Sequence, residues 1–596
     1  MKIIPRNSGY VLLLMILSVL TPGCKQQVKK AGANIRLDEL LESYAHGYYA
    51  LNPLQATRNG LNDFNDQLEM NLGQEYIRKM LAFNKLYLDS LAMLDTAALT
   101  YSEKLSVEIL DYKLKMENER FSAGYGLNRP VDQFVFSFPQ NFATLGSGTA
   151  YVPFKTEKDY RNFMSRMKAF PQWIDQAIQN MQSGIESHNT NPQASMEKVP
   201  AQLKPLFDGP TEQNIFYKPL FNLPEGLDSP GRARLIKEYK DVIEKEVMPA
   251  YKKLNEYLVK DYIPNTRTTT GLVDNANGDA EYAYWLKYYT TTNMTPDEIY
   301  DLGIREVARI RKEMDSLRTL TGFKGDLNAF FNYIRTDKRF FPFKTEEEVL
   351  DRYRSFQARM EPYLKKEFNL RPKAGFEVRA TEKFREAGAN AQYMTASRDG
   401  SRPGIFYETV RDPLKYNYFE METLFMHEAI PGHHFQSGLQ QEADIPEFRK
   451  SYWTSAFGEG WALYAESLGR ELGMMTDPYQ YMGRLNNEME RAVRLVVDAG
   501  MHAKGWSREK AIAYVLENQP VTEDVAVQRI ERYMVTAGQA TSYKVGEQTI
   551  LRLRKKAQEK LGSKFDIRAF HDEMLKEGCL PLLILEKHMN RWIKTQ

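Results

Sequence analysis

The spacing of apolar residues along the chain predicts a mainly helical protein. Three N-terminal segments, 37–51, 74–94 and 102–121, place apolar residues at i, i+3 and i+4, so each would present one continuous apolar face. The same spacing recurs in 157–185 and 230–260, with a proline-containing, loop-like stretch between them. Because this period matches the helical repeat, we expect helices to supply most of the core.

A different pattern further along the chain predicts a small β-sheet. Segments 376–381, 391–397 and 404–410 are short runs with β-branched or aromatic residues, and Gly and Asp residues separate them. One interpretation of the third run, "GIFYETV", is an edge strand that pairs with an extended peptide backbone; the alternative is an ordinary core strand. A boundary near residue 280 would divide the chain into an N-terminal helical region, 35–280, and a second region, 281–596.

Composition adds few constraints on function. The 596 residues are 27% charged and 42% hydrophobic, with a formal net charge of +2 at pH 7. These proportions are ordinary for a soluble globular protein that is long enough for two or more domains. The balanced charge gives no reason to expect nucleic acid or an anionic membrane surface as a partner.

The start of the chain differs from the rest and resembles an export signal. Two basic residues precede an apolar run at 10–20, which is shorter than the roughly 20 residues that a membrane-spanning helix needs. The small residues before Cys24 resemble a bacterial lipoprotein signal, which implies that residues 1–23 are removed and Cys24 carries lipid. Residues 24–34 would then form a tether. We expect an exported protein, either an outer-membrane lipoprotein facing the periplasm or, if the cysteine is incidental, a secreted or cell-surface protein.

The cysteine count limits the chemistry further. The chain has two cysteines, Cys24 and Cys579, so lipidation of the first leaves no intrachain disulfide. Two cysteines at opposite ends of the chain also exclude a cysteine-ligated metal. Any metal site must therefore use histidine and carboxylate ligands.

The candidate chemistry is concentrated in "MHEAIPGHHFQ", residues 426–436, which holds three of the eight histidines. The zinc-peptidase motif HExxH needs a histidine where Pro431 stands, and a proline there must bulge or end the helix. On a straight helix, His433 and His434 would lie about 9 Å and about 10.5 Å from His427 along the axis, too far for one ion. Looping out two residues would bring His433 to the second-ligand position, and looping out three would bring His434.

Glutamates near these histidines complete a candidate metal site. Glu428 follows His427 directly, where a zinc hydrolase holds the carboxylate that activates water. The segment "FGEGWALYAESLG" (457–469) carries Glu459 and Glu466 on one face of a predicted helix. "GEGWA" resembles the "NEGFA" segment of gluzincin metallopeptidases. This resemblance implies Glu459 as the third zinc ligand, with Glu466 as the alternative or as a group that orients a ligand histidine.

Longer blocks resemble the bacterial family "domain of unknown function 885", in the gluzincin-like clan. The resemblance implies a zinc hydrolase fold and names no substrate. Analogy with gluzincins that carry Gly-His after an enlarged motif favours His433 over His434 as the second ligand. The blocks are 288–314, 401–407, 427–436, 458–466, 490–506 and 538–547.

One face of the helix predicted within 490–506 is polar, although the segment is apolar overall. Its residues Arg491, Arg494, Asp498 and His502 follow the helical repeat. A buried polar face must be paired, so Asp498 and His502 could support the metal ligands or shuttle protons, which makes His502 a candidate catalytic residue. A structural ion network is the alternative. Arg491 or Arg494 could bind a substrate carboxylate in bidentate fashion.

The segment "TSYKVGE" supplies a candidate for stabilising negative charge on a substrate oxygen. Its Tyr543 is a phenol donor within one of the family-like blocks, and Tyr407 is the alternative. With Tyr543 in this role and Glu428 as general base, the sequence predicts a zinc-dependent peptidase.

The complete hypothesis is a secreted metallohydrolase with one Zn²⁺ per chain, held by His427, His433 and Glu459. We expect a mainly α fold with two helical lobes around a cleft and a small sheet next to the zinc-motif helix, as in gluzincins. The partner would be a peptide or small amide, with membrane contact only through lipid on Cys24. The alternatives are a zinc hydrolase of non-peptide amides or esters, and a non-catalytic helical binding lipoprotein.

Overall fold

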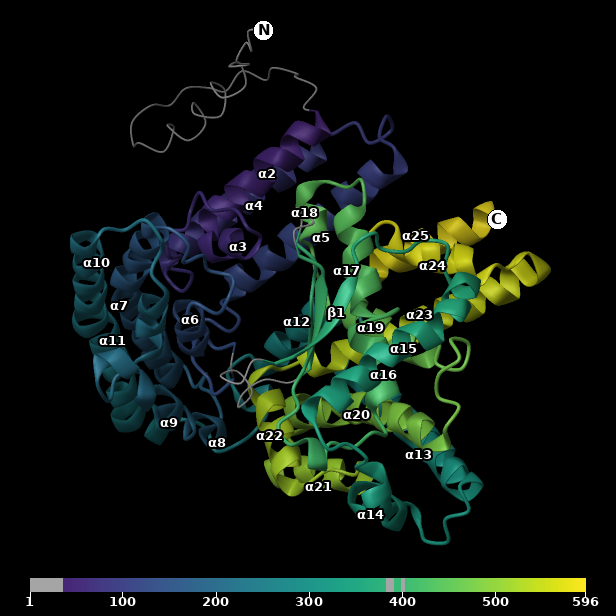
Figure 1. The fold of residues 1–596 in the computed structure, drawn as a ribbon. Coiled ribbons are helices and arrows are strands. Elements are labelled where there is room, and N and C mark those ends of the chain that lie inside the picture. Colours follow the sequence, from purple (N-terminus) through teal and green to yellow (C-terminus); the bar gives the residue numbers. More distant parts are fainter. Residues whose placement is uncertain (1–35, 135, 382–390, 398–401) are drawn as a thin grey trace.

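The computed structural model describes residues 36–134, 136–381, 391–397 and 402–596. Helices dominate it, and a small three-stranded sheet is placed among them, which confirms the predicted fold class at this level (Figure 1). The predicted signal peptide and tether, including Cys24, lie outside the described residues.

The N-terminal helices form where the apolar spacing predicts them. At Thr100 and Thr156, capping boxes satisfy the free backbone N–H groups at the starts of α5 and α7. The pattern at 230–260 forms two helices joined by a π-helical turn, η5 (Ile243–Val247), because Pro249 lacks the N–H that a continuous α-helix needs. The helices are α2 (Leu37–Leu51), α3 (Pro53–Arg58), α4 (Gln74–Ala92), α5 (Tyr101–Ala123), α6 (Phe138–Gly146), α7 (Glu157–Glu186), α8 (Gln193–Met196), α9 (Val199–Leu203), α10 (Ser229–Val242) and α11 (Met248–Tyr257).

The later helices surround the histidine-rich segment. Among them, α13 begins with a capping box at Thr295 and runs along α20, against which Gly303 allows a close approach. The helices are α12 (Gly278–Thr290), α13 (Pro296–Leu320), α14 (Leu327–Thr336), α15 (Glu346–Glu367), α16 (Met421–Glu428), α17 (His433–Glu442), α18 (Glu447–Lys450), α19 (Ser455–Ser467), α20 (Pro478–Lys504), α21 (Arg508–Asn518), α22 (Glu523–Val535), α23 (Ser542–Leu561), α24 (Ile567–Leu575) and α25 (Leu582–Thr595).

The sheet contains β1 (Phe376–Ala380), β2 (Gln392–Met394) and β3 (Gly404–Glu408) in the order β1-β3-β2. Strand β3 pairs in parallel with β1 and antiparallel with β2. The hypothesis that "GIFYE" is an edge strand is therefore wrong: β3 is the central strand, and all five of its residues are buried. An incoming peptide cannot pair with a strand whose two edges are already occupied.

Hydrophobic packing divides the molecule into separate cores. One core is built by residues from Leu54 to Tyr262 and includes the stacked rings of Phe142 and Phe170, 4.5 Å apart. A second core contains the sheet and α16, where Phe406 lies 6.5 Å from Phe425 between ring centroids. In Figure 1 the helices of the first core form a group on the left, and the sheet stands beside α16 and α19 on the other side.

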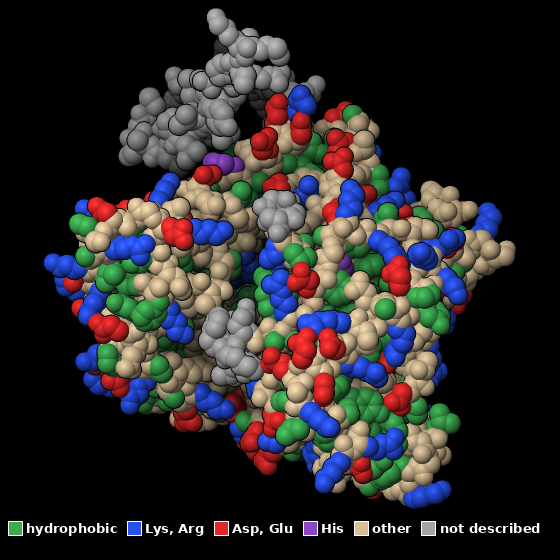
Figure 2. All heavy atoms as spheres, in the orientation of Figure 1, with side chains coloured by type: hydrophobic (Ala, Val, Ile, Leu, Met, Phe, Trp, Pro, Cys, Tyr) green, Lys and Arg blue, Asp and Glu red, His purple; other side chains and the backbone are tan. Residues whose placement is uncertain are grey.

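The surface carries both signs of charge. Lys and Arg side chains are interspersed with Asp and Glu side chains over the face shown in Figure 2, in agreement with the small net charge. Within the residues that the structure describes, none of the helices combines the length and the apolar character needed to cross a membrane.

Candidate metal centre

The histidine-rich segment forms two short helices rather than one bulged helix. Helix α16 ends at Glu428, and α17 begins at His433, so residues 429–432 form a turn between them. Pro431 has no N–H to continue the helical ladder, which explains the break. The turn restarts the chain so that His433 is the first residue of a new helix.

A glycine and a tryptophan fix this turn. A side chain on Gly432 would place its Cβ 1.9 Å from the carbonyl oxygen of His427, so only glycine fits there. The indole Nε1–H of Trp461, on α19, donates to the carbonyl oxygen of Pro431 at 2.8 Å, and this contact is buried. The turn is thus tied to the helix that carries the candidate third ligand.

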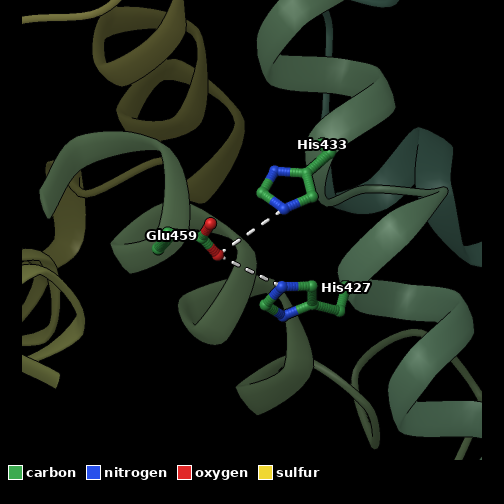
Figure 3. A group of neighbouring side chains, drawn as sticks. All are labelled: His427, His433 and Glu459. Carbon is green, nitrogen blue, oxygen red and sulfur yellow. Dashed lines mark ion pairs between the residues drawn. The ribbon is translucent and has the colours of Figure 1, made fainter. Parts of the chain in front are cut away.

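Three side chains converge at the junction of α16, α17 and α19. The Nε2 atoms of His427 and His433 lie 3.4 Å and 3.6 Å from Oε2 of Glu459, and the two imidazole rings are nearly perpendicular (Figure 3). These are the three residues that the sequence pattern and the resemblance named as ligands. Among the described residues, these three side chains lie close enough together to hold one metal ion.

The spacing of these atoms suits a tetrahedral ion. With bonds of about 2.0–2.2 Å to nitrogen and oxygen, two ligand atoms around zinc are about 3.4 Å apart. The two histidine–glutamate distances, 3.4 Å and 3.6 Å, fall at this value. Two imidazoles and one carboxylate are also the donor set of catalytic zinc sites, which keep a fourth position open.

Glu466 and His434, the alternative ligands, have other positions. Oε1 of Glu466 lies 2.7 Å from Nδ1 of His427, on the far side of the imidazole from Glu459. A carboxylate in this position fixes the tautomer and orientation of a metal-binding histidine. His434 turns toward the sheet, where its Nδ1 lies 2.7 Å from the hydroxyl of Tyr393. Nδ1 of His433 is buried and has no hydrogen-bond partner among the described residues.

Both glycines of "GEGWA" serve close packing. A Cβ on Gly458 would lie 1.9 Å from the ring of Trp453. A Cβ on Gly460 would lie 2.5 Å from Cα of Gly546, so α19 approaches the backbone of α23 closely. Sequence reasoning took Glu459 from this segment and missed the glycines, which place its helix against the one that carries Tyr543.

The charged groups of the site are buried and coupled to one another. Burial lowers the pKa of His427, but hydrogen bonds with Glu459 and Glu466 outweigh it and raise the pKa to about 10. Burial raises the pKa of Glu459, but the two histidines outweigh it and lower the pKa to about 2. With Glu428 also buried, three carboxylates face two imidazoles, an imbalance that a divalent ion would correct.

Tyr543 lies near this group. Burial raises the pKa of its phenol, and the charge of Glu459 contributes in the same direction. The guanidinium of Arg494 lies 4.7 Å from its ring centroid. Tyr407, the alternative, follows Phe406 on β3; since Phe406 packs toward Phe425 of α16, Tyr407 points to the opposite face of the sheet.

The polar face of α20 has other partners. The ring nitrogens of His502 lie within hydrogen-bond distance of the backbone N–H of Leu272 and the carbonyl of Tyr533, so His502 makes its contacts away from the three ligands. Asp498 accepts from the hydroxyl of Tyr282 instead of pairing with His502. A single carboxylate, Glu490, forms ion pairs with Arg491, Arg494 and Arg529.

A further buried carboxyl group lies on the sheet side of the site. Burial raises the pKa of Glu408, on β3, to about 7, and the charge of Glu428 contributes to the rise. No sequence pattern points to Glu408, because "GIFYE" has the composition of an ordinary strand and its proximity to α16 arises only from packing.

Comparison with known proteins places the chain in a group without an assigned activity. The sequence pattern of the family described as "Bacterial protein of unknown function (DUF885)" matches residues 53–589. No protein with a curated description matches the chain. A predicted lipoprotein from Colwellia psychrerythraea is 27% identical, with a TM-score of 0.84 over 94% of this chain and 99% of that one. A predicted lipoprotein of unknown function from Shewanella oneidensis, 20% identical, shares the fold with a TM-score of 0.74 over 94% and 100% of the two chains.

Proposed function

This chain belongs to the DUF885 family of bacterial proteins of unknown function, and from its own site we propose that it is a zinc-dependent metallohydrolase, most simply a peptidase. The observation that carries the proposal is the convergence of His427, His433 and Glu459 at the spacing of a tetrahedral zinc site. Two histidines on consecutive helical segments and a glutamate on a later helix follow the ligand order of gluzincins.

The residues around the ion would divide the chemistry among them. Bound Zn²⁺ supplies Lewis acidity, which lowers the pKa of a water and polarises a carbonyl group. Glu428, next to His427 and buried beside the two imidazoles, would take the proton from the attacking water and pass it to the leaving nitrogen. Tyr543 keeps its phenol proton at neutral pH because burial raises its pKa, so it can donate to the carbonyl oxygen as negative charge develops.

Glu466 would act through His427. Its carboxylate accepts the Nδ1–H of the imidazole and leaves the Nε2 lone pair directed at the ion position. This assignment gives each of the three glutamates a different role: Glu428 moves a proton, Glu459 is a ligand and Glu466 positions a ligand.

Export as a lipoprotein is part of the proposal. The N-terminal pattern that ends at Cys24 supports it, as do the two structural relatives, both described as predicted lipoproteins. The protein would then work at the cell envelope and hydrolyse peptides outside the cytoplasm. The lipid on Cys24 would be its contact with the membrane.

Metal content followed by hydrolysis tests the proposal. Elemental analysis of the purified protein should find one zinc per chain, lost in His427→Ala and Glu459→Ala. Glu428→Gln should keep zinc and lose activity by at least about 10²-fold on peptide substrates, because it removes the general base and no ligand. Glu471→Gln, an exposed glutamate beyond α19, is the matched control and should change neither quantity.

The outcomes separate the rival functions. A wild-type protein that is free of metal and cannot be loaded with zinc would exclude the enzyme and favour a binding lipoprotein. Cleavage of acyl amides or esters without any peptide cleavage would identify a non-peptide hydrolase of the same chemistry. Full activity in Glu428→Gln would refute the mechanism.

A further inference from the structure

A cavity of about 470 Å³ lies between the helices of the first core and helices α12 and α22. One wall comes from the end of α5, from residues between 126 and 134 and between 136 and 138, and from α7. The other comes from α12, the end of α22 and the turn at 535–539. Figure 2 shows that the molecule is hollowed between these two groups of helices. The walls are therefore contributed by distant parts of the chain.

Two arginines face this cavity without a carboxylate partner. The Nη2 of Arg532 donates to Gln539 at 3.0 Å, its guanidinium lies 4.8 Å from the ring centroid of Phe134, and its Nε is buried without a hydrogen-bond partner. Arg120, on the opposite wall, stacks near Trp285 at 5.9 Å and also has a buried Nε without a partner. Among the described residues, no ion pair is formed by either of them.

The other charged groups in the lining do not cancel this positive charge. Arg129 forms an ion pair with Glu281, a carboxylate outside the cavity lining that compensates its charge. Asp132 is the one acidic residue among those that line the cavity, and burial raises its pKa to about 7. The lining therefore has an excess of positive charge at neutral pH. Uncompensated guanidinium groups in a partly desolvated cavity favour an anion, and a planar carboxylate fits their donor geometry.

The remaining walls are aromatic. Phe138, Trp173, Trp285 and Tyr289 line the cavity together with Phe134. Phe136 also lines it and exposes 74% of its surface, an unusual position for a large apolar side chain. An aromatic lining beside a cationic pair suits a ligand that carries a carboxylate and a large apolar group close together.

Tyr543 lies near both a cavity residue, Arg532, and the candidate ligand Glu459. Gln539, which accepts a hydrogen bond from Arg532 and lines the cavity, lies four residues before Tyr543 in the chain. The phenol is within electrostatic range of both Arg532 and the candidate ligand Glu459. A peptide whose scissile carbonyl lies beside Tyr543 could thus extend its next residues into the cavity.

We propose that this cavity binds the C-terminal carboxylate of a short peptide, held between Arg532 and Arg120, with a large apolar side chain against the aromatic wall. The inference rests on the proposed peptidase function and names its substrate class. It makes the protein a peptidase that acts near the free C-terminus of small peptides. Arg491 and Arg494 are not assigned this role, because both form ion pairs with Glu490.

The test compares the tripeptide Ac-Ala-Phe-Phe as its free acid and as its C-terminal amide. Binding is measured by calorimetry on Glu428→Gln protein, and kcat/KM is measured on protein with Glu428 intact. Both measurements are made on four proteins: one with no further change, one with Arg532→Gln, one with Arg120→Gln, and one with Arg78→Gln. Arg78 is an exposed arginine on α4 and serves as the control. We expect the unchanged cavity and Arg78→Gln to prefer the acid by about tenfold or more, and the two cavity variants to lose most of this preference.

Binding and turnover separate the two levels of the argument. Acid-selective binding that is lost in Arg532→Gln, without any hydrolysis, would support the cavity and refute the peptidase. Hydrolysis with equal rates for acid and amide would support the peptidase and overturn the cavity assignment. Circular dichroism checks that each variant is folded. If Arg532→Gln is unstable, Arg120→Gln tests carboxylate binding from the opposite wall of the cavity. Acid preference that survives both substitutions overturns the proposal.

Discussion

Replacing Glu466 with glutamine should weaken zinc binding without abolishing it. The carboxylate lies 2.7 Å from Nδ1 of His427, and both side chains are buried, so this hydrogen bond fixes the ring whose Nε2 faces Glu459 and the proposed zinc position. Glutamine has a side chain of the same length and keeps an acceptor oxygen, but it lacks the negative charge that makes the imidazole a stronger donor to the metal. Alanine removes the acceptor as well.

The expected magnitude follows from the role of this contact. Loss of an outer hydrogen-bond partner of a metal ligand typically costs 10–100-fold in metal affinity, which is about 1.4–2.7 kcal/mol. We expect Glu466→Gln near the lower limit and Glu466→Ala near the upper one. Competition with a chromophoric zinc chelator at fixed pH measures both, with Glu471→Gln as the exposed control.

The comparison with Glu459 decides whether the reasoning holds. Glu459→Gln removes a carboxylate ligand and should lose more affinity than Glu466→Gln. If Glu466→Gln loses zinc as completely as Glu459→Gln, then Glu466 is itself a ligand. If neither Glu466 variant differs from wild type, the hydrogen bond to His427 does not position the ligand. Thermal melts of the metal-free proteins show whether a loss of affinity reflects unfolding.

Three further predictions follow from the same structure. Gly432→Ala should destabilise the protein by several kcal/mol and lower its zinc content, because a Cβ there would collide with a backbone carbonyl; an unchanged melting temperature would contradict this. His434→Gln should keep zinc while His433→Gln loses it, measured by elemental analysis, since only His433 faces Glu459; the reverse order would exchange their roles. Burial lowers the folded-state pKa of His571 to about 3, so the unfolded chain binds the extra proton and the stability that His571 contributes is lost as pH falls below about 6.5. Between pH 7 and pH 5.5, His571→Gln should therefore remove about 1.3 kcal/mol of acid destabilisation in urea titrations, and an equally steep pH dependence in this variant would refute the assignment.

Local patterns predicted several of the helices and all three strands. Helix α2 has the bounds of the predicted segment, 37–51, and each strand lies within its predicted run. These elements follow from side-chain periodicity, which depends only on neighbours along the chain. The position of β3 in the middle of the sheet was mispredicted, because strand order depends on pairing with residues remote in sequence.

The residues of the candidate site could be predicted only in part from local sequence patterns. The sequence named His427, His433 and Glu459, but it left His434 and Glu466 open as alternatives. The choice depends on the direction in which the turn at 429–432 restarts the helix, which no residue pattern encodes. The cavity arginines had no signal at all, since their meeting depends on how the two groups of helices pack.

The interrupted motif changes what the proposed metal site would require of the sequence. In a continuous HExxH helix, the helical repeat alone sets the distance between the two histidines. Here the turn sets that distance, and it is held by Gly432 and by the hydrogen bond between Trp461 and Pro431. Trp461 lies on the same helix as Glu459, so one contact couples the position of the second histidine to that of the glutamate. Trp461→Phe keeps most of the packing and removes only this hydrogen bond. If the coupling holds, it should lower zinc affinity although the side chain touches no ligand atom.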